Sequence, residues 1–331
     1  MISLASVLRR IALRTRPAAQ DSGAFLDVEE AQRLFGAVLD DAVPDIELGA
    51  LLASLALAGE STDELVGLQR ALADRCTRWS PELVRRPIAI PLYGLFPGEV
   101  ILAGLLAMIL RRFDVPVILH GPLDSSNGLS AAVLLRELDV LPCSGIAQAE
   151  AELASLGIVF LPAQLLSSAF ATMLALRARL GTPNAAHFAA QAIDPGGAGC
   201  VRVGMTIAAT TTDRLQGLHK AVEGDALVLA WPAGKSPANL AFRPRITRVR
   251  DGVCEPLFDA EAAEHAGGIP ASALDDPAAA AQWIRAVATR AAPVPVPLVN
   301  LAAACIYATG LTSDFAQAKA ITALHAGRLA A

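Results

Sequence analysis

The sequence predicts an α/β protein with a small all-α N-terminal domain and a larger α/β domain whose central sheet is mainly parallel. Three observations support this. Apolar residues recur at helical spacing through the first 80 residues, whereas short apolar strand-like runs alternate with helical segments from residue 88 onward. Ala, Leu and Val supply most of the apolar content, while aromatic residues are only 5% of 331, which favours helices and parallel strands over a β-sandwich.

The N-terminal segment 1–80 is expected to be a domain of helices joined by short loops. Asp27, with Glu30 three residues later, predicts a capped helix over 28–40. Pro44 begins a second helix that ends at Gly59. The run Ser61-Thr-Asp-Glu64 caps a third helix, which extends to about residue 78.

The remainder, residues 81–331, is expected to form the α/β domain. Strands are expected at 88–92, 115–119, 158–161, 201–205 and 226–230, and helices at 100–112, 128–138, 163–180, 184–193 and 209–222. A peripheral antiparallel piece is expected at 242–262, followed by two helices over 298–328. Ligands in parallel sheets bind at the carboxyl ends of strands, so the loops after Leu92 and Leu119 are the candidate ligand loops.

Composition excludes several classes of protein. Hydrophobic residues are 54% and the net charge is −5, so the chain is neither disordered nor uniformly basic. The uncharged runs 153–176 and 291–313 are interrupted by Gly and Pro, and we expect them to be buried core rather than membrane spans. The first residues show no signal peptide and the five cysteines form no CxxC pair, so we expect a cytoplasmic protein with reduced thiols.

Several motifs occur in the order of one enzyme family. They are Leu51-Leu-Ala-Ser-Leu-Ala-Leu-Ala-Gly-Glu-Ser-Thr-Asp-Glu-Leu65, Val117-Ile-Leu-His-Gly121, Ser125-Ser126 with Gly128 and Ser130-Ala-Ala-Val-Leu134, Leu156-Gly-Ile-Val-Phe-Leu-Pro162, Arg177-Ala-Arg-Leu-Gly181 and Asn300-Leu-Ala-Ala-Ala304. Together they resemble glycosyltransferase family 3, in particular the anthranilate phosphoribosyltransferases, over nearly the whole chain. The resemblance implies that a middle stretch, about 163–195, returns to the helical domain. It also implies a ligand cleft formed by Gly94, Gly98, His120, Gly121, Ser125, Ser126 and Arg177.

The sequence departs from the family where the phosphoribosyl donor would bind. The family's Gly-Thr-Gly-Gly-Asp loop is replaced by Pro91-Leu-Tyr-Gly-Leu-Phe-Pro-Gly-Glu99, in which Pro97 lacks an N–H donor and Glu99 would repel phosphate. Leu119, Pro122 and Leu123 stand where the family has polar residues. No acidic pair for Mg²⁺ occurs in 231–237. We therefore expect a vestigial cleft with no catalytic residue, metal or cofactor.

These departures resemble the divergent YbiB-type branch of the family, which lacks tryptophan-pathway activity. That resemblance implies a homodimer formed through the helical domain and binding of nucleic acid, preferentially single-stranded DNA or RNA. A pentosyl or phosphoribosyl transferase with an unknown acceptor and a regulatory homodimer without nucleic acid remain alternatives.

The distribution of charge is consistent with phosphate contacts. Residues 202–250 contain eight basic and three acidic residues, a local charge of +5. The candidate nucleic-acid contacts are Arg202, Arg214, Lys220, Lys235, Arg243, Arg245, Arg248 and Arg250, with Arg10 and Arg14 near the N-terminus. The same residues also fit an ordinary solvated surface or a dimer contact, and His120 also fits a hydrogen-bonded structural histidine.

Overall fold

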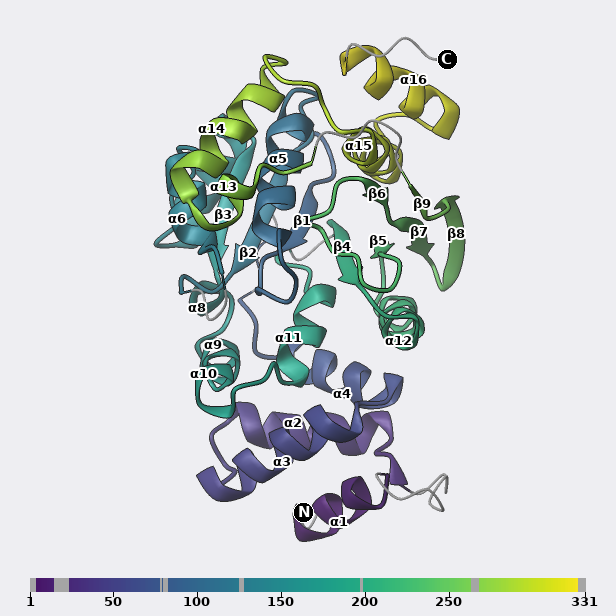
Figure 1. Cartoon of the computed structure of the whole chain (residues 1–331). Helices are drawn as coiled ribbons and strands as arrows, with labels where there is room; N and C mark the ends of the chain where they lie inside the picture. Colours follow the sequence, from purple (N-terminus) through teal and green to yellow (C-terminus); the bar gives the residue numbers. More distant parts are fainter. Residues whose placement is uncertain are drawn as a thin grey trace.

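The computed structural model describes residues 4–14, 24–77, 79, 83–124, 128–196, 199–262 and 268–326. Its N-terminal part is a bundle of four helices, which lies at the lower end of the molecule in Figure 1. They are α1 (Leu4–Arg14), α2 (Val28–Leu39), α3 (Asp45–Ala58) and α4 (Thr62–Ala73). The capping boxes expected at Asp27 and Ser61 are both present.

The larger part is built on a seven-stranded sheet with the order β3-β2-β1-β4-β5-β7-β8. The first five strands in that order are parallel, and β7 and β8 are antiparallel. The strands are β1 (Ile88–Pro91), β2 (Val117–Gly121), β3 (Ile158–Pro162), β4 (Val201–Thr206), β5 (Asp225–Ala230), β7 (Arg245–Arg250) and β8 (Val253–Phe258). The two-residue strands β6 (Phe242–Arg243) and β9 (Glu261–Ala262) form a separate pair.

The expectation of a peripheral antiparallel piece at 242–262 is therefore only partly right. The strands there are antiparallel, but β7 pairs along its whole length with β5 and so extends the central sheet. The expected helical content of 163–180 is confirmed. That segment forms three short helices, α8 (Ala163–Leu166), α9 (Ser168–Ala175) and α10 (Arg177–Leu180). Ser167 adopts an extended backbone between α8 and α9, and its hydroxyl caps the second of them.

Helices cover both faces of the sheet (Figure 1). The remaining helices are α5 (Glu99–Arg111), α6 (Ala131–Glu137), α7 (Ile146–Leu156), α11 (Ala185–Ala189), the 3₁₀ turn Ala190–Ala192, α12 (Ala209–Ala221), α13 (Ala271–Asp275), α14 (Pro277–Ala288), α15 (Val296–Ala308) and α16 (Phe315–His325). Among the described residues, no helix is both long and apolar enough to cross a bilayer.

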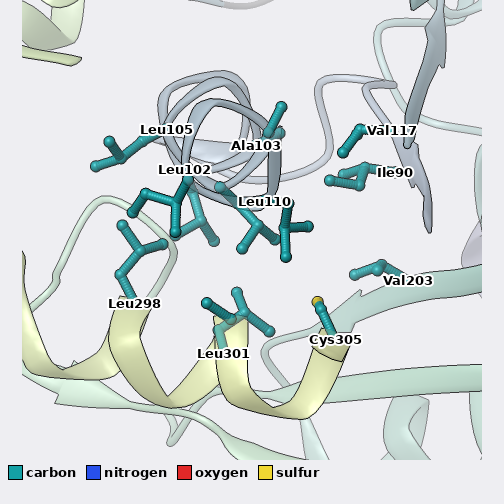
Figure 2. Close-up of a cluster of buried hydrophobic side chains, with 14 of the residues drawn as sticks. Ile90, Leu102, Ala103, Leu105, Leu110, Val117, Val203, Leu298, Leu301 and Cys305 are labelled. Carbon is teal, nitrogen blue, oxygen red and sulfur yellow. The ribbon is translucent and has the colours of Figure 1, made fainter. Parts of the chain in front are cut away.

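Two large apolar clusters divide the core between the faces. On one face, α5 and α15 pack against alternate residues of β1, β2 and β4, including Ile90, Val117 and Val203 (Figure 2). On the other face, Ala89 and Ile118 of the same strands contact the cluster that contains the helical bundle, α9 and α11. The middle helices α9 and α11 therefore pack with the N-terminal bundle, and a cleft lies beside them at the carboxyl ends of β1 and β2.

Candidate functional site

The loop that follows β1 is bound by a carboxylate from its own chain. Glu99 is the first residue of α5, and its side chain reaches back over the loop that precedes it. Its Oε1 accepts the backbone N–H groups of Tyr93 (2.8 Å) and Gly94 (3.2 Å). Its Oε2 accepts those of Leu95 (2.9 Å) and Phe96 (3.1 Å). Four consecutive donors thus converge on one carboxylate.

This carboxylate is buried, with only 4% of the residue exposed. Burial raises the pKa of the Glu99 carboxyl to about 7, and its four backbone hydrogen bonds oppose that rise. Gly98 precedes it with φ of +79°, and a Cβ at this position would lie 2.4 Å from the Cα of Ala238. The glycine is therefore needed for the turn and for the close contact with the segment after β5.

The carbonyl groups of the same loop are bound from the opposite side. The Arg177 guanidinium on α10 donates to the carbonyl oxygens of Tyr93 (3.3 Å) and Gly94 (2.8 Å). The four N–H groups from Tyr93 to Phe96 and the carbonyl groups of Tyr93 and Gly94 are thus all hydrogen-bonded within the protein. Arg177 and Gly94, which the resemblance placed in one cleft, do lie together.

His120 lies at the end of β2 beneath the loop. Its Nδ1 is 2.9 Å from the hydroxyl of Tyr93, whose ring also packs edge-on against Phe170. The residue is 1% exposed, and burial lowers the pKa of its imidazole to about 3, so it is neutral near pH 7. His120 therefore has the hydrogen-bonded structural role rather than a position on the cavity wall.

A cavity of about 240 Å³ lies between this loop and helices α8 to α10. Its wall is largely apolar, with Leu92, Val100, Leu129 and Leu174 among its residues. Its polar lining residues include Asp124, Gln164, Arg177 and His187. A second cavity of about 310 Å³ lies on the other side of the loop and is lined by Gly98, Glu99, Ala238 and Asp275, among others.

Three further cleft residues have separate outcomes. A Cβ at Gly121 would lie 2.3 Å from the carbonyl oxygen of Leu92, so this glycine permits the close approach of two chain segments. Ser125 and Ser126 lie outside the described residues.

Within the described ranges, no three His, Cys, Asp or Glu side chains are grouped as metal ligands.

At the opposite edge of the sheet, three arginines surround one carboxylate. Asp225, the first residue of β5, is 2% exposed. It is 2.6 Å from Arg86 and 3.0 Å from Arg248, and 3.9 Å from Arg250. The guanidinium groups of Arg248 and Arg86 hold the pKa of this carboxyl below its usual value against the effect of burial. The side chains of Arg86 and Arg250 are 37% and 59% exposed.

Three of the expected nucleic-acid contacts are wrong because their side chains are buried. Arg202 is 1% exposed in the central strand β4, and donates to the carbonyl of Val222. Arg248 is 6% exposed and paired with Asp225. The side chain of Arg14 is 3% exposed and forms an ion pair with the buried Glu64.

The other seven cations do not form one group. Arg10 pairs with Glu30, and Arg214 donates to the carbonyl of Glu60, at the helical bundle. Lys235, Arg243 and Arg245 lie near the carboxyl end of β5, where they contact Phe242, Glu261 and Asp259 respectively. Lys220, which is exposed, lies in the last turn of α12 shortly before Asp225, at the same edge as Arg250.

Sequence reasoning missed the partners that define both edges. Glu99 was interpreted only as a charge that repels phosphate, although a Glu directly after a Gly-containing loop could have indicated a carboxylate that caps unpaired N–H groups. Asp225 and Arg86 were not singled out, and no local signal joins residues that are 139 positions apart.

Comparison with known proteins agrees with this architecture. Residues 22–76 match the helical bundle domain of a glycosyl transferase family. The chain is 28% identical to YbiB of Escherichia coli over 288 residues, which are 86% of this chain and 89% of that protein. It is 32% identical to the anthranilate phosphoribosyltransferase of Methylocella silvestris over 161 residues, which cover 49% of this chain and 46% of the enzyme.

Solved structures extend the likeness to the whole fold. The anthranilate phosphoribosyltransferase of Thermus thermophilus superposes with a TM-score of 0.74 at 21% identity, covering 97% of this chain and 94% of the enzyme. The enzyme of Saccharomyces cerevisiae in complex with PRPP and Mg gives 0.66 at 12% identity, covering 97% and 93%. The protein is thus similar to the anthranilate phosphoribosyltransferases in its two-part fold, and its residues 22–76 match the helical bundle domain of a glycosyl transferase family.

Proposed function

We propose that this protein is a non-catalytic relative of the anthranilate phosphoribosyltransferases that binds single-stranded nucleic acid. One observation carries the loss of catalysis, which is the Glu99 carboxylate on the four N–H groups of the loop after β1. A pyrophosphate would need these backbone N–H groups as donors, and they are already bound by Glu99. The negative charge of the Glu99 carboxylate would also repel a pyrophosphate. The sequence of 231–237 also offers no carboxylate for Mg²⁺.

The nucleic-acid part of the proposal is supported by the edge around Asp225. Arg86 and Arg250 share this carboxylate with Arg248 and are partly exposed, and the exposed Lys220 lies at the same edge. Asp251, 3.3 Å from Arg250, and Glu223 and Glu255 lower the local positive charge. Arg245, 59% exposed beside Asp259, is a further candidate at the other end of β7.

Fluorescence anisotropy with labelled oligo(dT) at several salt concentrations tests this binding. Each phosphate contact that is lost lowers the slope of log affinity against log salt by ~0.7 for single strands. We expect Lys220→Glu with Arg250→Glu to weaken binding about tenfold and to reduce the slope. Arg136→Glu, on an exposed position of α6, is the matched control and should leave both unchanged.

The outcomes separate the alternatives. No anisotropy change with DNA or RNA at low salt would contradict nucleic-acid binding and favour a regulatory dimer. Calorimetric titration of the phosphoribosyl pyrophosphate donor with Mg²⁺ should be flat. Saturable binding with turnover would instead support a transferase with an unknown acceptor.

Dimerisation through the helical bundle is supported by one face of α3. Ile46, Ala50, Ala53 and Leu57 recur at helical spacing and are all exposed, and Ile46 and Leu57 are 85% and 81% exposed. Large exposed apolar residues in a stripe are typical of an interface. Light scattering should show a dimer for the native chain and a monomer for Ile46→Glu with Leu57→Glu. A native monomer would contradict this part.

A further inference from the structure

The loop after β1 has the geometry of an occupied anion site. Its four donors are consecutive and are shared evenly, with two N–H groups on each oxygen of Glu99. Successive backbone N–H groups that point to one centre form a concave nest for anions. The site is formed by Tyr93 to Phe96, before the helix begins, so it does not consist of the N–H groups of α5.

Glu99 differs from the carboxylates that cap helices elsewhere in this chain. Glu30 and Glu64 each occupy the third position of their helix and accept the backbone N–H of the capping residue, in the usual reciprocal box. Glu99 is instead the first helical residue and accepts none from its N-cap, Gly98. Glu99 accepts the backbone N–H groups of the loop, as a bound anion would.

We propose that Glu99 is an internal ligand that occupies an oxyanion site of the loop and excludes free phosphate-type anions from it. This inference rests on the proposed loss of donor binding but is independent of nucleic-acid binding. The backbone keeps the capacity to bind an anion, and the side chain alone blocks its use. The loop is thereby held in a ligand-bound form at all metabolite concentrations, with Arg177 fixing its carbonyl groups.

Access from solvent would follow from removal of the side chain. Glu99 lines the cavity of about 310 Å³, and Gly94 lines both this cavity and the one of about 240 Å³. The volume vacated in Glu99→Ala therefore joins space that already adjoins the donors. The four N–H groups would then be buried without partners, which favours uptake of an anion.

The decisive experiment is a calorimetric titration of Glu99→Ala with inorganic pyrophosphate at constant ionic strength. We expect saturable binding by the variant, at least tenfold tighter than any binding by the native chain. Asp27→Ala is the matched control, since its carboxylate accepts only the N–H of Glu30 and no nest remains when it is removed. Equal behaviour of a folded Glu99→Ala and the native chain would overturn the proposal.

Glu99→Gln keeps the inference testable if the alanine variant does not fold. Its amide retains one acceptor oxygen but turns an NH₂ group toward the other donors. We expect hydrogen exchange at Tyr93 to Phe96 to rise about tenfold or more, with exchange inside α5 unchanged. Unchanged protection of these four amides would contradict the role of the carboxylate. Oligo(dT) affinity should be unaffected by either variant, so failure here and failure of nucleic-acid binding can be distinguished.

Discussion

The two edges of the sheet each hold one buried carboxylate, but they surround it with different partners. At the carboxyl end of β1, Glu99 is bound by uncharged backbone dipoles. At the amino end of β5, Asp225 is bound by the charged side chains of Arg86 and Arg248, with Arg250 nearby. At the first edge the loop donors are therefore already bound by Glu99, and the Arg177 guanidinium is bound to carbonyl groups of the same loop. The second edge has two partly exposed arginines around its carboxylate. The anion-binding groups are thus already occupied by Glu99 at the edge where ligands usually bind in such sheets, whereas at the opposite edge some of them remain exposed.

The largest expected effect comes from removing the shared carboxylate. Asp225→Ala leaves Arg248, 6% exposed, without its ion-pair partner. Breaking a buried pair in this way should lower the free energy of unfolding by ~3–5 kcal/mol, measured by urea denaturation. Asp259→Ala removes the exposed partner of Arg245 and should cost under ~0.5 kcal/mol. Similar decreases in the free energy of unfolding for Asp225→Ala and Asp259→Ala would contradict the expected difference between a buried and an exposed ion pair.

The pH dependence of stability probes the other carboxylate. The pKa of Glu99 is raised by burial from 4.5 to about 7. The folded state therefore retains a proton that the unfolded state releases, so stability is highest below pH 4.5 for this group and falls as pH rises to about 7. The full contribution is up to ~3 kcal/mol.

A comparison of the native chain with Glu99→Gln at pH 5, 6, 7 and 8 isolates this contribution. His120 contributes the opposite slope, because its lowered pKa makes the unfolded state take up protons below pH 6.5. Since His120 is present in both proteins, its effect cancels in the difference. We expect the difference in free energy of unfolding to change in favour of the variant from pH 5 to about 7 and then to level off by pH 8. A constant difference would mean that Glu99 does not titrate there.

Much of the fold could be predicted from the sequence because its signals are local. The capping boxes at Asp27 and Ser61 and the apolar strands at Ile88 and Val117 each depend on residues a few positions apart. The pairing of β7 with β5 depends instead on an antiparallel return that no turn motif specified. Because the sequence holds no local signal for this pairing, 242–262 was expected to be peripheral, whereas the structure has two further strands of the main sheet there.

The candidate site was harder to predict because burial of charge is a tertiary property. Arg202 lies in the sequence Val-Arg-Val-Gly-Met, and a central strand covered on both faces would bury it, but the excess of basic residues along 202–250 suggested a surface. Arg14 was likewise counted as exposed, because its partner Glu64 is 50 residues away. Charge counted along the chain thus identifies cations but not which of them remain available.

His219, a buried residue of α12, tests whether an unpaired polar side chain next to Arg202 lowers stability. Both ring nitrogens are buried with no hydrogen-bond partner among the residues that the structure describes. Burial, followed by the charge of Arg202, lowers the pKa of this imidazole well below 6.5. His219→Leu removes these unsatisfied groups and should raise the free energy of unfolding by ~1–2 kcal/mol, measured by urea denaturation near pH 7. A lower free energy of unfolding for His219→Leu would instead indicate that the imidazole makes a stabilising polar contact.

The smallest effect is expected at Arg250, and it tests the surplus of cations directly. Its side chain is 59% exposed and lies 3.3 Å from the exposed Asp251 and 3.9 Å from Asp225, which already has closer contacts with Arg86 and Arg248. If Arg250 is in excess, Arg250→Ala should change the free energy of unfolding by less than ~0.5 kcal/mol, as an exposed pair does. Arg248→Ala is the control and should cost several times more, since it removes two hydrogen bonds to the buried carboxylate. A loss above ~1 kcal/mol for Arg250→Ala would mean that Asp225 needs all three arginines. The edge would then have no spare charge for a phosphate, and nucleic-acid binding there would lose its physical basis.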